Sequence, residues 1–367
     1  MKRVLALLAF VPTVFVAECT KHEQTQLQHG GDLYGRMCSV CHGASGEGYK
    51  ADNATALSHP DFLASVSDDF LKHSITVGRS GTVMSSWGKE RGGPLPPSDV
   101  DALVAFIRTW QTKSSATLDD HPLSGDAGRG SVTYNAQCVR CHGPNGTTGP
   151  NVRIGNADFL GDASNGFLRY AIHNGRLGTP MPSFDQTLGD SGIDDVIAYL
   201  RSWQAASSAT ALSPVAGSLG AHDIVPRDLP APPNPPPPLT LGPVPLNRGG
   251  PEPVGFKAFP EKTNCDTVHG ELDHGAKMAI LDARAPPDYT NEHISGAVSV
   301  PFYDPDPFVP KLPRDAWLVC YCSCPSAESG ALAQKLMDKG FKKVTVLEEG
   351  LGTWKMKKYG TKTGPQP

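Results

Sequence analysis

Two copies of one five-residue pattern, Cys38-Ser39-Val40-Cys41-His42 and Cys138-Val139-Arg140-Cys141-His142, decide how most of this chain folds. In Cys-x-x-Cys-His the two thiols can form thioethers with the vinyl groups of a c-type haem, and the adjoining histidine can bind the iron. The two copies lie in matching surroundings, which chance does not explain. The sequence therefore predicts two covalently bound c-type haems, attached through Cys38, Cys41, Cys138 and Cys141.

The surroundings of the two motifs align as an internal repeat over residues 28–113 and 124–205. The matching pairs are Tyr34 with Tyr134, Asp61-Phe62-Leu63 with Asp158-Phe159-Leu160, Phe70-Leu71 with Phe167-Leu168, and Arg108-Thr109-Trp110-Gln111 with Arg201-Ser202-Trp203-Gln204. A fixed repeat of this kind indicates an internal duplication. Each copy closes on a predicted amphipathic helix, for which we expect Ser98 and Ser191 to be the N-caps.

Both units resemble class I cytochrome c domains, and together they resemble a tandem dihaem cytochrome c. The loops Gly78-Arg79-Ser80-Gly81-Thr82-Val83-Met84 and Gly175-Arg176-Leu177-Gly178-Thr179-Pro180-Met181 carry the rest of the resemblance. It implies two all-α domains in which iron is bound by His42 with Met84 and by His142 with Met181. His59, His73 and His173 are the alternative ligands. Because His73 and His173 precede the loops, we expect them at the surface or at helix ends.

Two His/Met haems would leave no open position for a substrate on either iron. The predicted function is therefore outer-sphere electron transfer between a donor and an acceptor protein, such as a component of a respiratory chain. The formal charge of −4, from 33 basic and 37 acidic residues, gives no sign of a nucleic-acid-binding surface.

The first 19 residues have the features of an export signal, with Lys2 and Arg3 before an apolar run from Val4 to Ala17. Export agrees with the haem motifs and predicts a periplasmic protein. The sequence Val16-Ala17-Glu18-Cys19 resembles a lipoprotein cleavage site and predicts a lipid anchor on Cys19, although Glu18 stands where a small residue is usual. The alternatives are a soluble periplasmic protein or an uncleaved anchor.

Residues 207–253 form a proline-rich segment that we expect to act as a semi-rigid linker. Over residues 256–360, short apolar strands alternate with helices, which indicates an α/β domain with a central parallel sheet. The predicted strands are 278–282, 297–301, 317–322 and 344–347, and the predicted helices are 326–339 and one near Trp354.

This last region resembles a rhodanese domain. The resemblance rests on Asp282-Ala283-Arg284, Tyr289, His293-Ile294-Ser295-Gly296-Ala297, Tyr321-Cys322, and Gly350 with Trp354. It implies that Cys322 is a nucleophile that carries a persulfide. A thiol at a strand end that faces loop amides and a helix N-terminus is shifted towards thiolate.

The active loop departs from the rhodanese pattern. Residues 322–329 include no basic residue, so thiosulfate is a doubtful substrate, and Arg314 and Lys335 are the nearest cations in sequence. Cys324 could attack a Cys322 persulfide or oxidise with Cys322, or it could be incidental. We expect Cys320 to be a buried small residue, and Glu349 replaces a usual glycine.

Three functions are consistent with this sequence. The leading hypothesis is a dihaem electron carrier that is coupled to sulfane-sulfur or thiol chemistry at Cys322. The second is a sulfurtransferase or sulfur-oxidising enzyme that works through a Cys322 persulfide. The third is a redox-sensing or binding-only rhodanese module.

Overall fold

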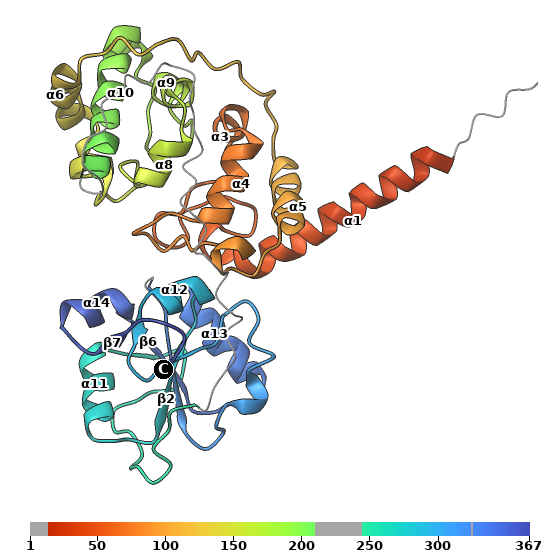
Figure 1. Cartoon of the computed structure of the whole chain (residues 1–367), viewed down its shortest axis with the longest axis vertical. Helices are drawn as coiled ribbons and strands as arrows, with labels where there is room; N and C mark the ends of the chain where they lie inside the picture. Colours follow the sequence, from red (N-terminus) through yellow and green to blue (C-terminus); the bar gives the residue numbers. More distant parts are fainter. Residues whose placement is uncertain (1–13, 210–243, 324–325) are drawn as a thin grey trace, which may run out of the picture.

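The structure is a computed structural model that describes residues 14–209, 244–323 and 326–367. Figure 1 shows two helical units and an α/β unit, with the first helical unit between the second and the α/β unit. The predicted fold class, two all-α cytochrome c domains followed by an α/β domain with a parallel sheet, is confirmed. Most of the predicted linker lies outside the described residues. Residues 1–13 of the predicted export signal also lie outside them.

The two helical units are built from the same series of elements. The first consists of α1 (Val14–Met37), α2 (Ser39–His42), α3 (Pro60–Ser65), α4 (Asp68–Val77), η1 (Lys89–Arg91) and α5 (Pro97–Arg108). The second consists of α6 (Ala127–Gln137), α7 (Val139–His142), η2 (Pro144–Gly146), α8 (Ala157–Asp162), α9 (Asn165–Asn174) and α10 (Asp185–Ala209). In each, the long first and last helices pack across one another.

A glycine in each first helix permits this crossing. A Cβ atom on Gly30 of α1 would lie 2.1 Å from the carbonyl oxygen of Ala102 in α5. A Cβ atom on Gly130 of α6 would lie 1.9 Å from the carbonyl oxygen of Asp195 in α10. Neither distance is sterically possible, so only glycine lets the two backbones approach this closely.

The last helix of each unit does not begin at the serine that was predicted to be its N-cap. Helix α5 starts at Pro97 with Pro96 as N-cap and no side-chain cap, because proline at the first helical position needs no partner for an N–H. The Ser98 prediction is therefore wrong. Helix α10 begins earlier than expected, at Asp185, and is interrupted at Gly189, where φ is 60°. Ser191 lies inside α10, just after this break.

An arginine near the end of each last helix ties it to a shorter helix. Arg108 donates from Nη1 to the carbonyl oxygen of Leu63 and from Nη2 to that of Val66, each at 2.7 Å. Arg201 makes the same pair of bonds to Leu160 and Ala163. Those carbonyls lie at the C-terminal ends of α3 and α8, where helical partners are lacking. The repeated Arg-x-Trp-Gln sequence therefore closes both units in the same way.

The two helical units are joined by an aromatic cluster. Phe70 of the first unit stacks on Phe167 of the second at 5.4 Å between ring centroids, and it meets Phe159 edge-on at 6.3 Å. Arg79 lies over the Phe70 ring and pairs with Asp162 of the second unit at 2.6 Å. Apolar and charged contacts therefore hold the units together.

The α/β unit is a five-stranded parallel sheet with strand order β1-β6-β5-β2-β4. The strands are β1 (Lys262–Thr263), β2 (Met278–Asp282), β4 (Val298–Ser299), β5 (Trp317–Tyr321) and β6 (Val344–Leu347), and the short strands β3 (His293–Ile294) and β7 (Thr361–Lys362) pair separately. Helices α11 (Cys265–Asp273), α12 (Pro286–Asn291), α13 (Ala327–Asp338), α14 (Gly350–Met356) and η3 (Val309–Lys311) complete the unit.

Alternate residues of the central strands face opposite layers. Ala279, Leu281 and Cys320 pack in one cluster with Leu332 and Leu336 of α13. Met278, Ile280 and Val319 pack in the other cluster, with Val268 of α11 and Trp354 of α14. Cys320 is buried, as expected.

Cys265 is the first residue of α11 and is buried. Its backbone N–H donates to Glu349 Oε2 at 2.6 Å. The carboxylate that replaces a usual glycine therefore accepts a hydrogen bond from the start of a helix, a position that favours negative charge.

Helix α1 runs without interruption through Cys19. Within the described parts of the chain, none of the helices combines the length and the apolar composition that a bilayer span requires.

The glycine crossing gives a test of the fold. We expect Gly30→Ala to lower the free energy of unfolding of the first helical unit by about 1–3 kcal/mol, because α1 and α5 must separate. Gly35→Ala, on the same helix, has no atom within 4 Å of its new Cβ and should be neutral or stabilise by about 0.4–1 kcal/mol. Denaturant unfolding followed by far-UV circular dichroism measures both. Equal stability of the two variants would contradict the packing described.

Candidate functional site

Each Cys-x-x-Cys-His motif forms a single helical turn that follows directly on a longer helix. Cys38 is the N-cap of α2 and Cys138 is the N-cap of α7. A tyrosine from the preceding helix fixes each turn: Tyr34 donates to the carbonyl oxygen of Gly43, and Tyr134 to that of Gly143, both at 2.7 Å. The tyrosine pair that the repeat revealed therefore holds the two motifs in one conformation.

The motif histidines are oriented by one hydrogen bond each. His42 Nδ1 lies 2.9 Å from the carbonyl oxygen of Thr55, and His142 Nδ1 lies 2.9 Å from that of Val152. A carbonyl only accepts, so Nδ1 must carry the proton and Nε2 is left as the basic nitrogen. Burial lowers the pKa of both imidazoles, which keeps the rings neutral. A neutral, oriented imidazole is the form that binds a metal.

The two methionine loops have the same backbone fold. Arg79 N–H donates to the carbonyl oxygen of Met84, and Arg176 N–H to that of Met181, each at 2.9 Å. In each loop a threonine, Thr82 or Thr179, also accepts a bond from the methionine N–H, at 3.1 and 3.2 Å. One backbone bond and one bond to a threonine hydroxyl therefore fix the backbone of each methionine in the same way.

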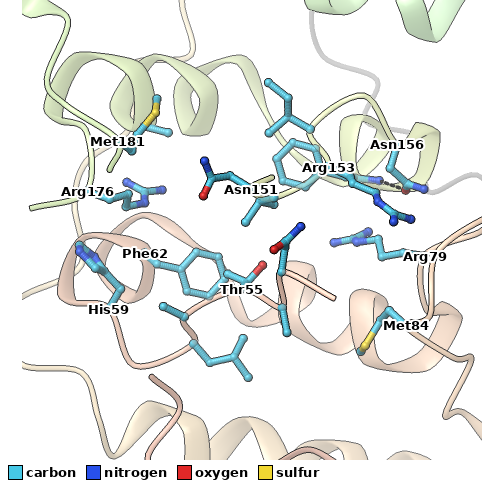
Figure 2. Close-up of a pocket in the computed structure, with 18 of the residues that line it drawn as sticks. Thr55, His59, Phe62, Arg79, Met84, Asn151, Arg153, Asn156, Arg176 and Met181 are labelled. Carbon is cyan, nitrogen blue, oxygen red and sulfur yellow. Dashed lines mark hydrogen bonds between the residues drawn. The ribbon is translucent and has the colours of Figure 1, made fainter. Parts of the chain in front are cut away.

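One cavity of about 550 Å³ joins the two units. Its lining includes all eight predicted haem residues: Cys38, Cys41, His42, Met84, Cys138, Cys141, His142 and Met181. Figure 2 shows Met84 and Met181 on opposite sides of it. The remaining wall is largely apolar, with Phe62, Phe159 and Phe167 among its residues. Thiols, imidazole nitrogens and thioether sulfurs around an apolar cavity are the set that a c-type haem requires.

The alternative histidines differ in their relation to this cavity. His59 lines it, but its Nε2 lies 2.9 Å from the carbonyl oxygen of Leu177. His73 pairs with Asp162 at 2.6 Å, and His173 pairs with Asp185 at 3.1 Å, and neither lines the cavity. His173 lies in the last turn of α9, at a helix end as expected.

Sequence reasoning missed a group of polar side chains that point towards this cavity. Figure 2 shows Arg79, Arg153, Arg176, Asn151 and Asn156 around it. Burial lowers the pKa of Arg176, although the charge of Asp61 opposes this shift. Buried guanidinium and amide groups are suited to the carboxylates of a haem. The sequence did contain evidence for two of these residues, because Arg79 and Arg176 occupy the same position in the two methionine loops.

Cys322 follows directly on β5 and has a relative exposure of 0%. Its sulfur lies 3.4 Å from Ser329 Oγ in the first turns of α13. The thiol therefore faces the N-terminal part of a helix, where negative charge is favoured. Cys324, the second predicted active cysteine, lies outside the described residues.

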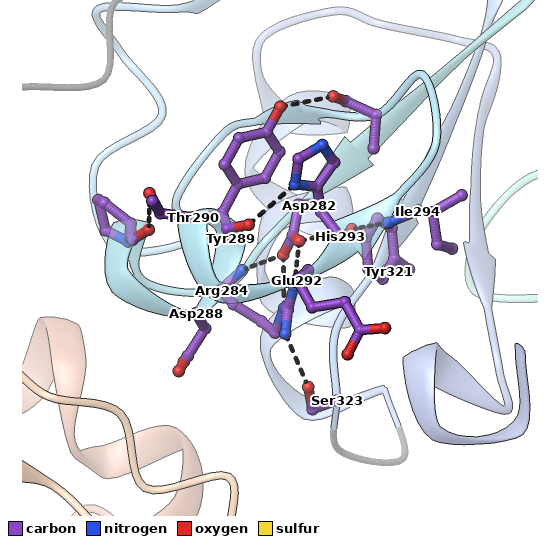
Figure 3. A network of polar contacts seen from close by, with 12 residues as sticks. Asp282, Arg284, Asp288, Tyr289, Thr290, Glu292, His293, Ile294, Tyr321 and Ser323 are labelled. Carbon is purple, nitrogen blue, oxygen red and sulfur yellow. Dashed lines mark hydrogen bonds and ion pairs between the residues drawn. The ribbon is translucent and has the colours of Figure 1, made fainter. Parts of the chain in front are cut away.

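A cation that sequence reasoning did not assign reaches the cysteine loop. Arg284 Nη1 donates to Ser323 Oγ at 3.2 Å, while its other nitrogens bond both carboxylate oxygens of Asp282 (Figure 3). Burial alone would lower the pKa of Arg284, but the charge of Asp282 outweighs it and raises the pKa. Tyr321 donates to the same carboxylate at 2.5 Å. The Asp282 carboxylate therefore balances most of the positive charge of Arg284 beside the cysteine loop.

The two cations nearest in sequence bond elsewhere. Arg314 lies over the Phe341 ring at 4.3 Å, and Lys335 donates to the carbonyl oxygen of Phe302 at 2.8 Å.

Glu328 is a buried carboxyl group near the Cys322 loop. It lies in the first turn of α13, is 5% exposed, and also lines the cavity of the helical units. Burial, with the nearby charge of Cys322, raises the pKa of this carboxyl well above its usual value. The sequence placed Glu328 in the loop but could not place it at the haem cavity.

Two family models match the chain. "Cytochrome C oxidase, cbb3-type, subunit III" matches residues 25–107 and 125–200, and "Rhodanese-like domain" matches residues 265–357.

Curated relatives match the helical units only in part. A "Cbb3-type cytochrome c oxidase subunit CcoP" of Azospirillum sp. (strain B510) is 26% identical over 47% of this chain and 60% of its own. A "Cytochrome bc1 complex cytochrome c subunit" of Mycobacterium leprae is 26% identical over 52% of this chain and 66% of its own. The chain thus spans about 60% of the length of the cbb3-type relative.

Solved structures match single parts of the chain. The rhodanese-like domain of the Anabaena sp. Alr3790 protein is 27% identical, with a TM-score of 0.26, over 28% of this chain and 78% of its own. A chain of the Kuenenia stuttgartiensis reducing HAO-like protein complex is 20% identical, with a TM-score of 0.32, over 48% of this chain and 96% of its own.

The paired Cys-x-x-Cys motifs, the repeated helical units and the family matches agree. This chain consists of two cytochrome c domains that resemble subunit III of cbb3-type cytochrome c oxidase, within residues 25–200, followed by a rhodanese-like domain at 265–357.

Proposed function

We propose that this protein is a dihaem electron carrier whose rhodanese-like domain oxidises a small sulfur compound at Cys322. One observation carries the first part: the eight residues of both haem motifs and both methionine loops line one cavity. Bound there, each haem would supply an iron that accepts and releases single electrons.

The chain's own residues would hold and tune these haems. Cys38 with Cys41, and Cys138 with Cys141, would form the thioethers, and His42 and His142 would bind iron through Nε2. Met84 and Met181 would supply thioether sulfur, a weak donor that favours the reduced iron. The apolar wall would exclude water, which also raises the reduction potential.

The relatives point to the kind of partner. They are named as subunits of cbb3-type cytochrome c oxidase and of the cytochrome bc1 complex. We therefore propose that this chain exchanges electrons with a respiratory-chain complex outside the cytoplasm. Its predicted export signal supports that location, and its predicted lipid anchor on Cys19 would keep it at the membrane surface.

The burial of Cys322 limits the sulfur compound. Because the Cys322 side chain has 0% exposure, its surroundings must open before any donor reaches the thiol, and a small donor such as hydrosulfide needs less opening than a bulky thiol. Arg284 beside Ser323 favours an anion at the loop, which is also the observation that supports the alternative of sulfurtransferase activity. Against thiosulfate, this cation is already paired with Asp282.

The ligand assignment gives a test that needs no partner. Met84→His and Met181→His should each lower the reduction potential of one haem and leave the other unchanged, because imidazole replaces a thioether. A redox titration followed in the haem absorption bands measures both waves in wild type and variants. A variant whose two waves both stay at the wild-type potentials would show that its methionine is not a ligand.

The sulfur chemistry gives a second test. Hydrosulfide should reduce the oxidised wild-type protein, and Cys322→Ser should lose this reaction, because the sulfur that forms the persulfide is absent. Cys265→Ser is the matched control, since Cys265 is also a buried thiol but packs on the other face of the sheet. Stopped-flow absorbance in the haem bands gives the rates.

Equal rates for wild type and Cys322→Ser would refute the coupling. Loading with thiosulfate followed by cyanide then tests the alternative: thiocyanate release from wild type, but not from Cys322→Ser, would identify a sulfurtransferase.

A further inference from the structure

The two haem domains differ at the surface that contacts the rhodanese-like domain. Ser85, directly after Met84, donates from Oγ to Asp288 Oδ2 at the edge of that domain. The corresponding residue of the second domain is Pro182, which has no hydroxyl to donate. The repeat is therefore asymmetric beside one of its two predicted iron ligands.

A second contact extends the same surface. The Trp87 ring meets the Tyr303 ring of the rhodanese-like domain at 5.4 Å between centroids, and both side chains are buried. Phe184 stands at the corresponding position of the second domain, and both Trp87 and Phe184 line the shared cavity. Trp87 therefore contacts the rhodanese-like domain in addition to lining the cavity.

The haem-attachment turn of the first domain is part of this contact. Helix α2, which contains Cys41 and His42, packs against α13, the helix that follows the Cys322 loop. Glu328 of α13 lies in the wall of the haem cavity.

Both sides of the first haem site therefore touch the domain that holds Cys322, through α2 on the histidine side and through Ser85 and Trp87 on the methionine side. The second haem domain lies beyond the first one (Figure 1). Electron transfer between sites weakens steeply with their separation, so the nearer haem is the natural acceptor.

We infer that electrons from sulfur bound at Cys322 enter the cytochrome pair at the first haem, across the surface formed by α2, Ser85 and Trp87 with α13, Asp288 and Tyr303. The second haem then passes them to the external acceptor. This inference rests on the proposed sulfur chemistry at Cys322 and adds the route and the docking surface.

The reaction balances for hydrosulfide. The Cys322 thiolate and one HS⁻ form an S–S bond, the S–H bond breaks, and the products are a persulfide anion, one proton and two electrons. The proton is released to water. Two oxidised haems, held by His42 with Met84 and by His142 with Met181, would together supply the two-electron oxidant, one electron each.

The docking surface can be tested without any turnover. In the double variant Ser85→Cys with Asp288→Cys, oxidation should form an interdomain disulfide, because the two side chains are in contact. The matched control is Pro182→Cys with Asp288→Cys, which places the thiol at the equivalent position of the second domain and should not cross-link. Peptide mass spectrometry of the full-length haem-loaded protein detects the bond. Cross-linking through residue 182 and not through residue 85 would overturn the proposed surface.

The route is tested by mixing hydrosulfide with the two ligand variants. Met84→His should lose the fast reduction of both haems, because the haem that receives the electrons has become a poor acceptor. Met181→His should retain a fast phase that accounts for the first haem alone. Full reduction by dithionite and an unchanged far-UV circular dichroism spectrum confirm that each variant is loaded and folded.

The outcomes separate this inference from the function on which it rests. Loss of the fast phase in Met181→His, with retention in Met84→His, would overturn the route while the Cys322 chemistry stands. A Cys322→Ser variant that is reduced as fast as wild type would overturn both.

Discussion

The Nδ1–H bond from each motif histidine to a backbone carbonyl is the constraint on which the haem sites depend. It fixes the proton on one nitrogen and so assigns the other to the cavity. The tyrosine bonds to Gly43 and Gly143 hold the turn that presents each ring. The glycine crossings then bring the first and last helices close enough to wall the cavity behind it. A local hydrogen bond therefore sets the chemistry, and helix packing encloses it.

The sequence predicted what is local and repeated. The haem motifs, the methionine loops and the strands over 278–282 and 344–347 all carry their own pattern. Sequence reasoning failed where tertiary contacts decide. Ser98 looked like a cap, but Pro96 and Pro97 already start that helix without one. Helix α11 and the short strands β1, β3 and β7 were not predicted, because they carry too few apolar residues to show a period.

The polar residues of the site were the least predictable from sequence. Arg284, two residues after the end of β2, reaches the cysteine loop through a contact between residues far apart in the chain. Glu328 faces a cavity that another domain builds. Cys324, together with most of the proline-rich linker, lies outside the described residues, so the predicted roles of both stay predictions. Sequence motifs therefore predict the ligands of a site. They do not predict the charged residues around it, such as Arg284 and Glu328, because those depend on how distant segments and domains pack.

The shared cavity has a consequence for how the molecule is assembled. Its wall takes residues from both cytochrome domains, and the Phe70 and Phe167 rings stack across the boundary between them. Haems bound to the four cysteines would therefore occupy space that the two domains enclose together. The contact between the domains would then depend on whether both cofactors are attached.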